Sequence, residues 1–225
     1  ALDTPEIDRA KTLTSQLAPH IGGIKIGMEY FYATGVDGYK AIAAQKVPVF
    51  LDLKLHDIPN TVAAAIRALT PLEPAILNVH AGGGAAMMQA AAEAANDYEG
   101  ISPMMIAVTI LTSLEATDLH AMGVSGTPED QALRLADIAQ QAGMQGVVCS
   151  AHEIEALRAH CGPDFKLIVP GIRPKSSPTH DQKRVMTPEQ ALAAGADILV
   201  IGRAITSADN PVKAAKAIHE SLSGA

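Results

Sequence analysis

Short runs of apolar residues alternate with longer amphipathic segments along the whole chain. The apolar runs predict strands at residues 1–3, 22–26, 47–54, 75–80, 103–111, 146–150, 166–170 and 197–203. The segments between them predict helices at 4–17, 28–45, 61–69, 85–95, 128–142, 153–160 and 188–194, and a last one from 211. Strands that are apolar throughout and alternate with helices are typical of a parallel sheet covered on both faces.

Eight strand–helix units within 225 residues predict an α/β fold of the closed (β/α)8 type, a TIM barrel. The alternative is an open doubly wound sheet, but no Gly-x-Gly-x-x-Gly motif follows the first strand to support it. Barrels of this length are routinely one domain, so we expect a single domain over residues 1–225. The chain begins abruptly at Ala1, and the first strand is therefore expected to be truncated at its N-terminus.

The stretch from residue 47 to 61 carries charged residues at the end of an apolar strand. Asp52 and Lys54 are two positions apart, so on a strand they point to the same face. Asp57 follows closely enough to return to the same place. Charges at the end of a buried strand are costly unless they are paired or used. An ion pair that holds the strand end and a catalytic group both remain possible at this point.

Polar residues stand at the carboxyl ends of most of the predicted strands. They are Asp3, Lys25, Asp52, Lys54, His80, Thr112, Ser150 and Arg203. In a (β/α)8 barrel the carboxyl ends of the strands meet at the rim that carries the active site. This placement favours a catalytic role for the charged stretch over a purely structural ion pair.

The loops after the seventh and eighth predicted strands have the composition of a phosphate site. Gly171, two residues before Arg173, and the Gly202-Arg203 pair would offer backbone N–H groups and guanidinium groups to an anion. The segment 171–187 is too long for a simple connection and is interpreted as a lid, with a solvated basic loop as the alternative.

Composition narrows the possible partners. The net charge of −7, the 3% aromatic content and the absence of Trp argue against nucleic acid or an anionic membrane as a main partner. The two cysteines have no metal-like spacing. The chain contains no signal peptide and no run of 18 apolar residues, so a cytoplasmic location is expected.

These motifs together resemble the orotidine 5′-phosphate decarboxylase family, in its bacterial form. The matching pieces lie along the chain in the family's order. They are Ala-Leu-Asp3, Ile-Lys25-Ile-Gly, Phe-Leu-Asp52-Leu-Lys54-Leu-His-Asp57-Ile-Pro-Asn-Thr61, Leu-Thr112-Ser, Pro-Gly-Ile-Arg173-Pro, Asp-Gln182 and Ile-Gly202-Arg203. The run Asp-x-Lys-x-x-Asp-Ile-Pro-Asn-Thr is the most specific of them.

The resemblance implies a cofactor-free and metal-free decarboxylation of orotidine monophosphate to UMP and CO2 in pyrimidine biosynthesis. It implies Lys54 as the proton donor to C6, with Asp52, Lys25 and Asp57 completing an alternating charge network. It also implies a homodimer in which Asp57 and Thr61 reach the partner's site. The residues implied to bind substrate are Asp3, Lys25, Asp52, Thr61, Thr112, Arg173, Gln182, Gly202 and Arg203.

Two other functions compete with this hypothesis. Metal-dependent hexulose- and ketogulonate-phosphate enzymes share the barrel and an Asp-x-Lys-x-x-Asp pattern, but they use Mg²⁺. A metal would need a second carboxylate near Asp52, where this chain has Lys25, a cation that would repel Mg²⁺. A non-catalytic phosphate-binding barrel would keep Arg203 and the lid without needing a lysine between acids.

Overall fold

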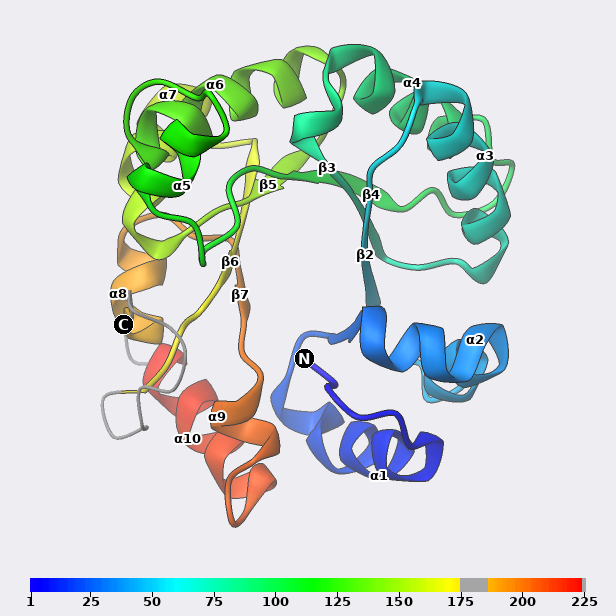
Figure 1. The fold of residues 1–225 in the computed structure, drawn as a ribbon. Coiled ribbons are helices and arrows are strands. Elements are labelled where there is room, and N and C mark those ends of the chain that lie inside the picture. The colour runs from blue at the N-terminus through cyan, green and yellow to red at the C-terminus, as the bar shows by residue number, and fades with distance from the viewer. Residues whose placement is uncertain (175–185, 224–225) are drawn as a thin grey trace.

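The computed structural model describes residues 1–174 and 186–223. In this part of the chain, parallel strands form one sheet in sequence order, and helices surround it (Figure 1). The strands are β1 (Ile24–Gly27), β2 (Val49–Leu55), β3 (Ile76–His80), β4 (Met104–Val108), β5 (Gly146–Val148), β6 (Lys166–Pro170) and β7 (Ile198–Val200). The predicted alternation of strands and helices and the TIM-barrel class are confirmed.

In the described part of the chain, the helices on the outside of the barrel include the eight predicted ones, in the predicted order, and two short ones that were not predicted. They are α1 (Ile7–Leu17), α2 (Met28–Ala43), α3 (Pro59–Leu69), α4 (Ala85–Asn96), α5 (Ala116–Ala121), α6 (Pro128–Gln141), α7 (Ile154–Cys161), α8 (Pro188–Ala193), α9 (Arg203–Thr206) and α10 (Pro211–Ser223). Short 3-10 turns lie at Ala18–His20, Thr70–Leu72, Ala81–Gly83 and Ala151–Glu153. α2 is broken at Gly35, whose φ of 63° suits a residue without a Cβ.

The barrel is closed at its seam by the first two residues of the chain. Leu2 forms an isolated parallel bridge with Ile26 of β1, and its N–H donates to the Lys25 carbonyl at 2.9 Å. On the other side, the amino group of Ala1 donates to the Ile201 carbonyl, just beyond β7, at 2.7 Å. Figure 1 shows the N-terminus lying between β1 and the chain that leaves β7. The first of the eight expected strands is therefore a single bridge, and seven full strands complete a nearly closed barrel.

The strands are apolar on both faces because each face has its own core. Phe50, Ile76, Ile106 and Ile168 form a buried cluster inside the barrel. Their neighbours along the strands, such as Leu51, Leu77 and Leu167, belong to the larger cluster that packs against the helices. The alternation of side chains along a strand places successive residues in the two cores. This explains why the strand segments are continuously apolar.

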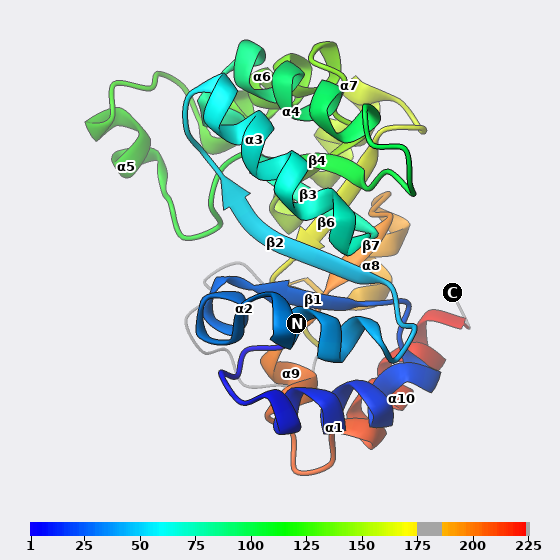
Figure 2. The same ribbon diagram turned by 90° about the vertical axis from the view of Figure 1, so that its right-hand side faces the viewer.

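Several strands are shorter than predicted. The expected strand 103–111 ends at Val108, and the expected strand 197–203 is confined to Ile198–Val200. Beyond these ends the chain turns into the rim loops. Figure 2 shows the β2 arrow pointing to the side of the molecule from which α5 projects.

Among the described helices, none has the length and apolar character needed to cross a membrane.

Candidate active site

A cation–carboxylate–cation array lies at the carboxyl ends of β1 and β2. Asp52 is 6% exposed, and each of its carboxylate oxygens contacts a different lysine. The Lys25 ammonium lies 2.9 Å from Oδ2, and the Lys54 ammonium lies 2.6 Å from Oδ1. The structure thus brings together three of the four residues expected in the charge network.

The two lysines control the ionisation of Asp52. Burial raises the pKa of the Asp52 carboxyl, but the opposing effects of the Lys25 and Lys54 ammonium groups are larger together and hold that pKa below its usual range. Asp52 is therefore an anion at neutral pH. The site carries a fixed alternation of positive, negative and positive charge before any substrate binds.

The contact between Asp52 and Lys54 arises from an irregular strand rather than from regular alternation. Lys54 has a φ of 52°, in the left-handed region that few side-chain-bearing residues adopt. The register of β2 against β3 shifts between Leu51 and Leu55, so the strand bulges at the charged residues. The two side chains do lie together, but an irregular backbone rather than the predicted regular alternation brings them into contact.

Asn78 is a member of this cluster that the sequence reasoning missed. Its side chain is buried at 1% exposure in β3. Its Oδ1 accepts the backbone N–H of Lys54 at 2.8 Å, and its Nδ2 donates to Asp52 Oδ1 at 2.7 Å. The available signal was a lone amide residue within an otherwise apolar strand, since such a group is buried only when it is hydrogen-bonded.

Asp57 and Thr61 lie outside this array in the structure of one chain. Both are exposed: Asp57 lies between β2 and α3, and Thr61 lies in the first turn of α3. The Asp57 carboxylate accepts the backbone N–H of Ile58 at 2.6 Å. Within the described ranges, the only carboxylate that contacts the Lys54 ammonium is that of Asp52. Within one chain, Asp57 therefore does not return to Asp52 and Lys54. Its expected contribution to a partner's site stays a prediction.

Three other residues expected to bind substrate, Asp3, Gly202 and Arg203, and the expected Thr112 lie in or next to the loops at the same rim. Gly202 lies beside Asp3, because a Cβ built on Gly202 would come within 3.3 Å of Asp3 Oδ2. Arg203 follows directly as the exposed first residue of α9. Thr112 is exposed in the turn between β4 and α5.

The segment interpreted as a lid is described only at its two ends. Ile172 forms an isolated bridge with Met186, and the Arg173 N–H donates to the Met186 carbonyl at 3.1 Å. The Arg173 side chain is 7% exposed. Gln182, one of the residues expected to bind substrate, lies outside the described residues.

His80 is the last residue of β3, as predicted, and its side chain is hydrogen-bonded. Its Nδ1 accepts the Gly82 N–H at 3.1 Å, and its ring stacks on that of His56 with centroids 5.1 Å apart. Burial, followed by the charges of His56 and Lys54, lowers the pKa of His80. Over residues 1–174 and 186–223, no group of three or more His, Cys, Asp or Glu side chains is arranged to hold a metal ion.

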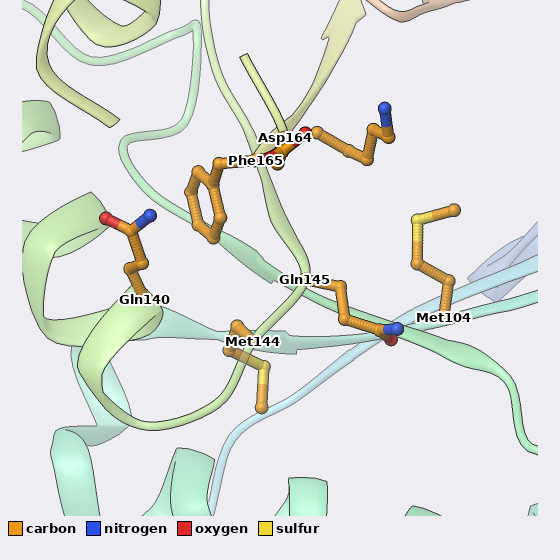
Figure 3. A pocket seen from close by; sticks show the side chains of 7 residues that line it. Met104, Gln140, Met144, Gln145, Asp164 and Phe165 are labelled. Carbon is orange, nitrogen blue, oxygen red and sulfur yellow. The ribbon is translucent and has the colours of Figure 1, made fainter. Parts of the chain in front are cut away.

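The hollow in Figure 3 lies at the other end of the barrel. It has a volume of about 350 Å³ and is lined by Met104, Gln140, Met144, Gln145, Asp164, Phe165 and Lys166. Met104 and Lys166 are the first residues of β4 and β6, so the hollow faces the amino ends of the strands. In this architecture that end serves stability, and catalysis belongs to the carboxyl ends.

A parallel barrel with an ordered charge array at its carboxyl rim defines a TIM-barrel enzyme. Comparison with known proteins specifies which one. The model of the "Orotidine 5'-phosphate decarboxylase / HUMPS family" matches residues 1–218. The chain belongs to this family, and it is a decarboxylase, a carboxy-lyase.

Individual relatives match over nearly the full length of the chain. The orotidine 5′-phosphate decarboxylase of Rhodospirillum rubrum is 53% identical and covers 100% of this chain and 93% of its own length. That of Sphingopyxis alaskensis is 50% identical and covers 99% of this chain and 97% of its own length. The crystal structure of orotidine 5′-phosphate decarboxylase from Lactobacillus acidophilus has a TM-score of 0.87 at 36% identity, over 98% of this chain and 96% of that one.

Proposed function

We propose that this chain decarboxylates orotidine 5′-monophosphate to UMP and CO2 without a cofactor, and that Lys54 donates the proton to C6. The observation that carries the proposal is the array of Lys25, Asp52 and Lys54 at the carboxyl rim of the barrel. The match to orotidine 5′-phosphate decarboxylases over nearly the full length of the chain supports the choice of substrate.

The chemistry of the reaction requires such an array. Loss of CO2 from C6 leaves a carbanion whose electron pair cannot spread into the π system of the pyrimidine ring. An ammonium group held next to C6 stabilises this charge, and because it is already in place it needs little reorganisation during the reaction. Lys54 then delivers its proton to C6, so the electron pair of the broken C–C bond becomes a C–H bond.

Asp52 has two effects in this mechanism. Its carboxylate contacts the Lys54 ammonium at 2.6 Å and holds it in position. It would also lie beside the carboxylate of the substrate and repel it, and this repulsion is relieved when neutral CO2 leaves. Both effects require Asp52 to be ionised, which its lowered pKa provides.

The other rim residues are proposed to hold the rest of the substrate. Asp3 and Lys25 would bind the ribose hydroxyls, and Thr112 the pyrimidine. Gly202, Arg203, Arg173 and Gln182 would bind the phosphate. Phosphate binding by the loop after β6 and the start of α9 agrees with the usual phosphate site of these barrels. Binding energy from this distant group can then serve the chemistry at C6.

A homodimer with shared sites is part of the proposal. Asp57 and Thr61 are exposed on the same face of the chain as the carboxyl end of β2, and neighbouring Ile58 is 65% exposed. Asp57 of each subunit would approach Lys54 of the other and complete the alternating network.

The function is tested by following conversion of orotidine monophosphate to UMP with and without EDTA. We expect equal rates in both, because the proposed chemistry uses only side chains. A rate abolished by EDTA and restored by Mg²⁺ would instead favour the metal-dependent sugar-phosphate enzymes. Binding of the nucleotide without turnover would favour a phosphate-binding barrel.

Replacement of Arg203 by alanine is expected to weaken the use of the phosphorylated substrate selectively. A charge-assisted hydrogen bond to phosphate contributes about 1.5–3 kcal/mol, so kcat/KM for orotidine monophosphate should fall roughly 10- to 100-fold. The value for the unphosphorylated nucleoside orotidine should change far less. Arg67→Ala, at an exposed position in the last turn of α3, is the control and should leave both values unchanged. Equal losses for both substrates would show that Arg203 does not bind the phosphate.

A further inference from the structure

The irregular part of β2 stands against a single residue of β3. The ladder pairs on either side are Leu51 with Leu77 and Leu55 with Val79. Between these pairs β2 contains residues 52–54, whereas β3 contains only Asn78. Three residues facing one cannot all form regular ladder hydrogen bonds, so the bulge leaves backbone groups of β2 in need of another partner.

The side chain of Asn78 supplies that partner at Lys54. Its Oδ1 accepts the Lys54 backbone N–H at 2.8 Å. Lys54 holds a φ of 52°, a conformation that is unfavourable for a residue with a Cβ and persists only where the surroundings impose it. The hydrogen bond from Asn78 satisfies the N–H in this conformation, and the conformation directs the lysine side chain to Asp52.

The other end of the same amide holds the carboxylate. Asn78 Nδ2 donates to Asp52 Oδ1 at 2.7 Å, the oxygen that also accepts from the Lys54 ammonium at 2.6 Å. A backbone N–H can only donate and an ionised carboxylate can only accept. The amide can therefore satisfy both neighbours in one orientation alone, with its oxygen toward Lys54 and its nitrogen toward Asp52.

From this geometry we infer that Asn78 is a positioning residue, which fixes both the strained backbone of Lys54 and the carboxylate of Asp52. Neither a carboxylate nor an apolar side chain could replace it, since the first lacks a donor and the second lacks both functions. Asn78 is 1% exposed, and its two hydrogen bonds are directed into the charge array. The inference rests on the proposed roles of Lys54 and Asp52 in decarboxylation.

The first test is Asn78→Leu, which keeps the number and branching of the side chain's heavy atoms and removes both hydrogen bonds. We expect kcat to fall on the order of 100-fold, because small displacements of a catalytic group have effects of this size, while KM changes by less than about threefold. The control is Thr14→Val, which removes an equally buried hydroxyl that donates to the Ala10 carbonyl within α1. It should keep the parental kcat, with thermal melting measured for both variants.

The second test is Asn78→Asp. If Asn78 had a purely structural role, kcat of this variant and kcat of Asn78→Leu would depend on pH in the same way. The ionised carboxyl can accept the Lys54 N–H, but it cannot donate to Asp52 and repels it. Two adjacent carboxylates raise one pKa, so the introduced group should take up a proton as the pH falls and then donate as the amide did. We expect kcat of Asn78→Asp to rise relative to the parent between about pH 7 and pH 5, and kcat of Asn78→Leu to show no such rise.

The outcomes separate this inference from the proposed function. If the parent chain decarboxylates orotidine monophosphate but both Asn78 variants keep kcat within about threefold of it, the inference is wrong and the function stands. If the parent has no such activity, the function is wrong, and a crystal structure of Asn78→Leu still tests the positioning role. Lys54 keeping its positive φ and its contact with Asp52 in that structure would overturn it. If the leucine variant does not fold, the pH profile of Asn78→Asp decides.

Discussion

Lys54→Ala is expected to lower kcat/KM for orotidine monophosphate by at least about 10³-fold. Removing one preorganised charge-stabilising group typically costs 10²–10³-fold, and loss of a proton donor costs a further factor on the order of 10²–10⁴. Both functions are assigned to the same ammonium group. The loss should appear mainly in kcat, since the substitution removes an interaction that is strongest in the transition state.

The fold of the Lys54→Ala variant should remain intact. Alanine retains the Cβ, so the left-handed conformation at residue 54 is no more strained than in the parent. Asp52 keeps the Lys25 ammonium at 2.9 Å and the Asn78 amide at 2.7 Å, so its buried charge is still paired. Circular dichroism and thermal melting check this expectation.

The matched control is Lys216→Ala on α10. Lys216 is 60% exposed and pairs with Glu220 across one turn of the helix, as an ordinary surface ion pair. Its removal should leave turnover unchanged. Near-normal activity of Lys54→Ala, measured beside this control, would refute the assignment of Lys54 as the proton donor.

Mixed dimers of Lys54→Ala and Asp57→Ala chains are expected to recover activity that neither variant has alone. If each site takes Lys54 from one subunit and Asp57 from the other, a mixed dimer contains one site with both residues intact. Random pairing of equal amounts makes half of the dimers mixed, so about 25% of all sites should be restored. The measurement is turnover after the two variants are refolded together, compared with each variant refolded alone.

The structure provides a control that should show no rescue. Lys25 and Lys54 contact the same carboxylate, that of Asp52, within one chain. Every site in a mixed dimer of Lys25→Ala and Lys54→Ala chains therefore carries one of the two defects. Rescue in the first mixture and none in the second would establish shared sites. Failure of both mixtures would mean that Asp57 serves its own subunit or is not catalytic.

Most of the barrel could be predicted from the order of apolar and polar segments. The strand Lys166–Pro170 has the expected bounds, and α6 and α8 end within one residue of the expected position. Two short helices, α5 and α9, were missed. α9 has four residues, which is too short to show a 3.6-residue hydrophobic repeat. α5 has six residues and begins with a local hydrogen bond from the Glu115 N–H to the Asp118 carboxylate, which hydrophobic periodicity does not reveal.

The charged part of the site was predictable for a different reason. Asp52 and Lys54 are close in sequence, and Lys25 stands at the end of the preceding strand, so parallel order brings all three to one rim. The homodimer, the cytoplasmic location and the single domain over residues 1–225 stay predictions. The roles assigned to individual site residues likewise await the substitutions described above.

The sequence by itself determined which segments form strands, that those strands are parallel, and which charged residues stand at their carboxyl ends. These properties follow from periodicity and from short-range order along the chain. Only the tertiary structure decided that Asn78 would reach Lys54, 24 positions away, and that residues 1 and 2 would close the seam between β1 and β7. Such contacts depend on the register between neighbouring strands, and a bulge changes that register without leaving a periodic signal in the sequence.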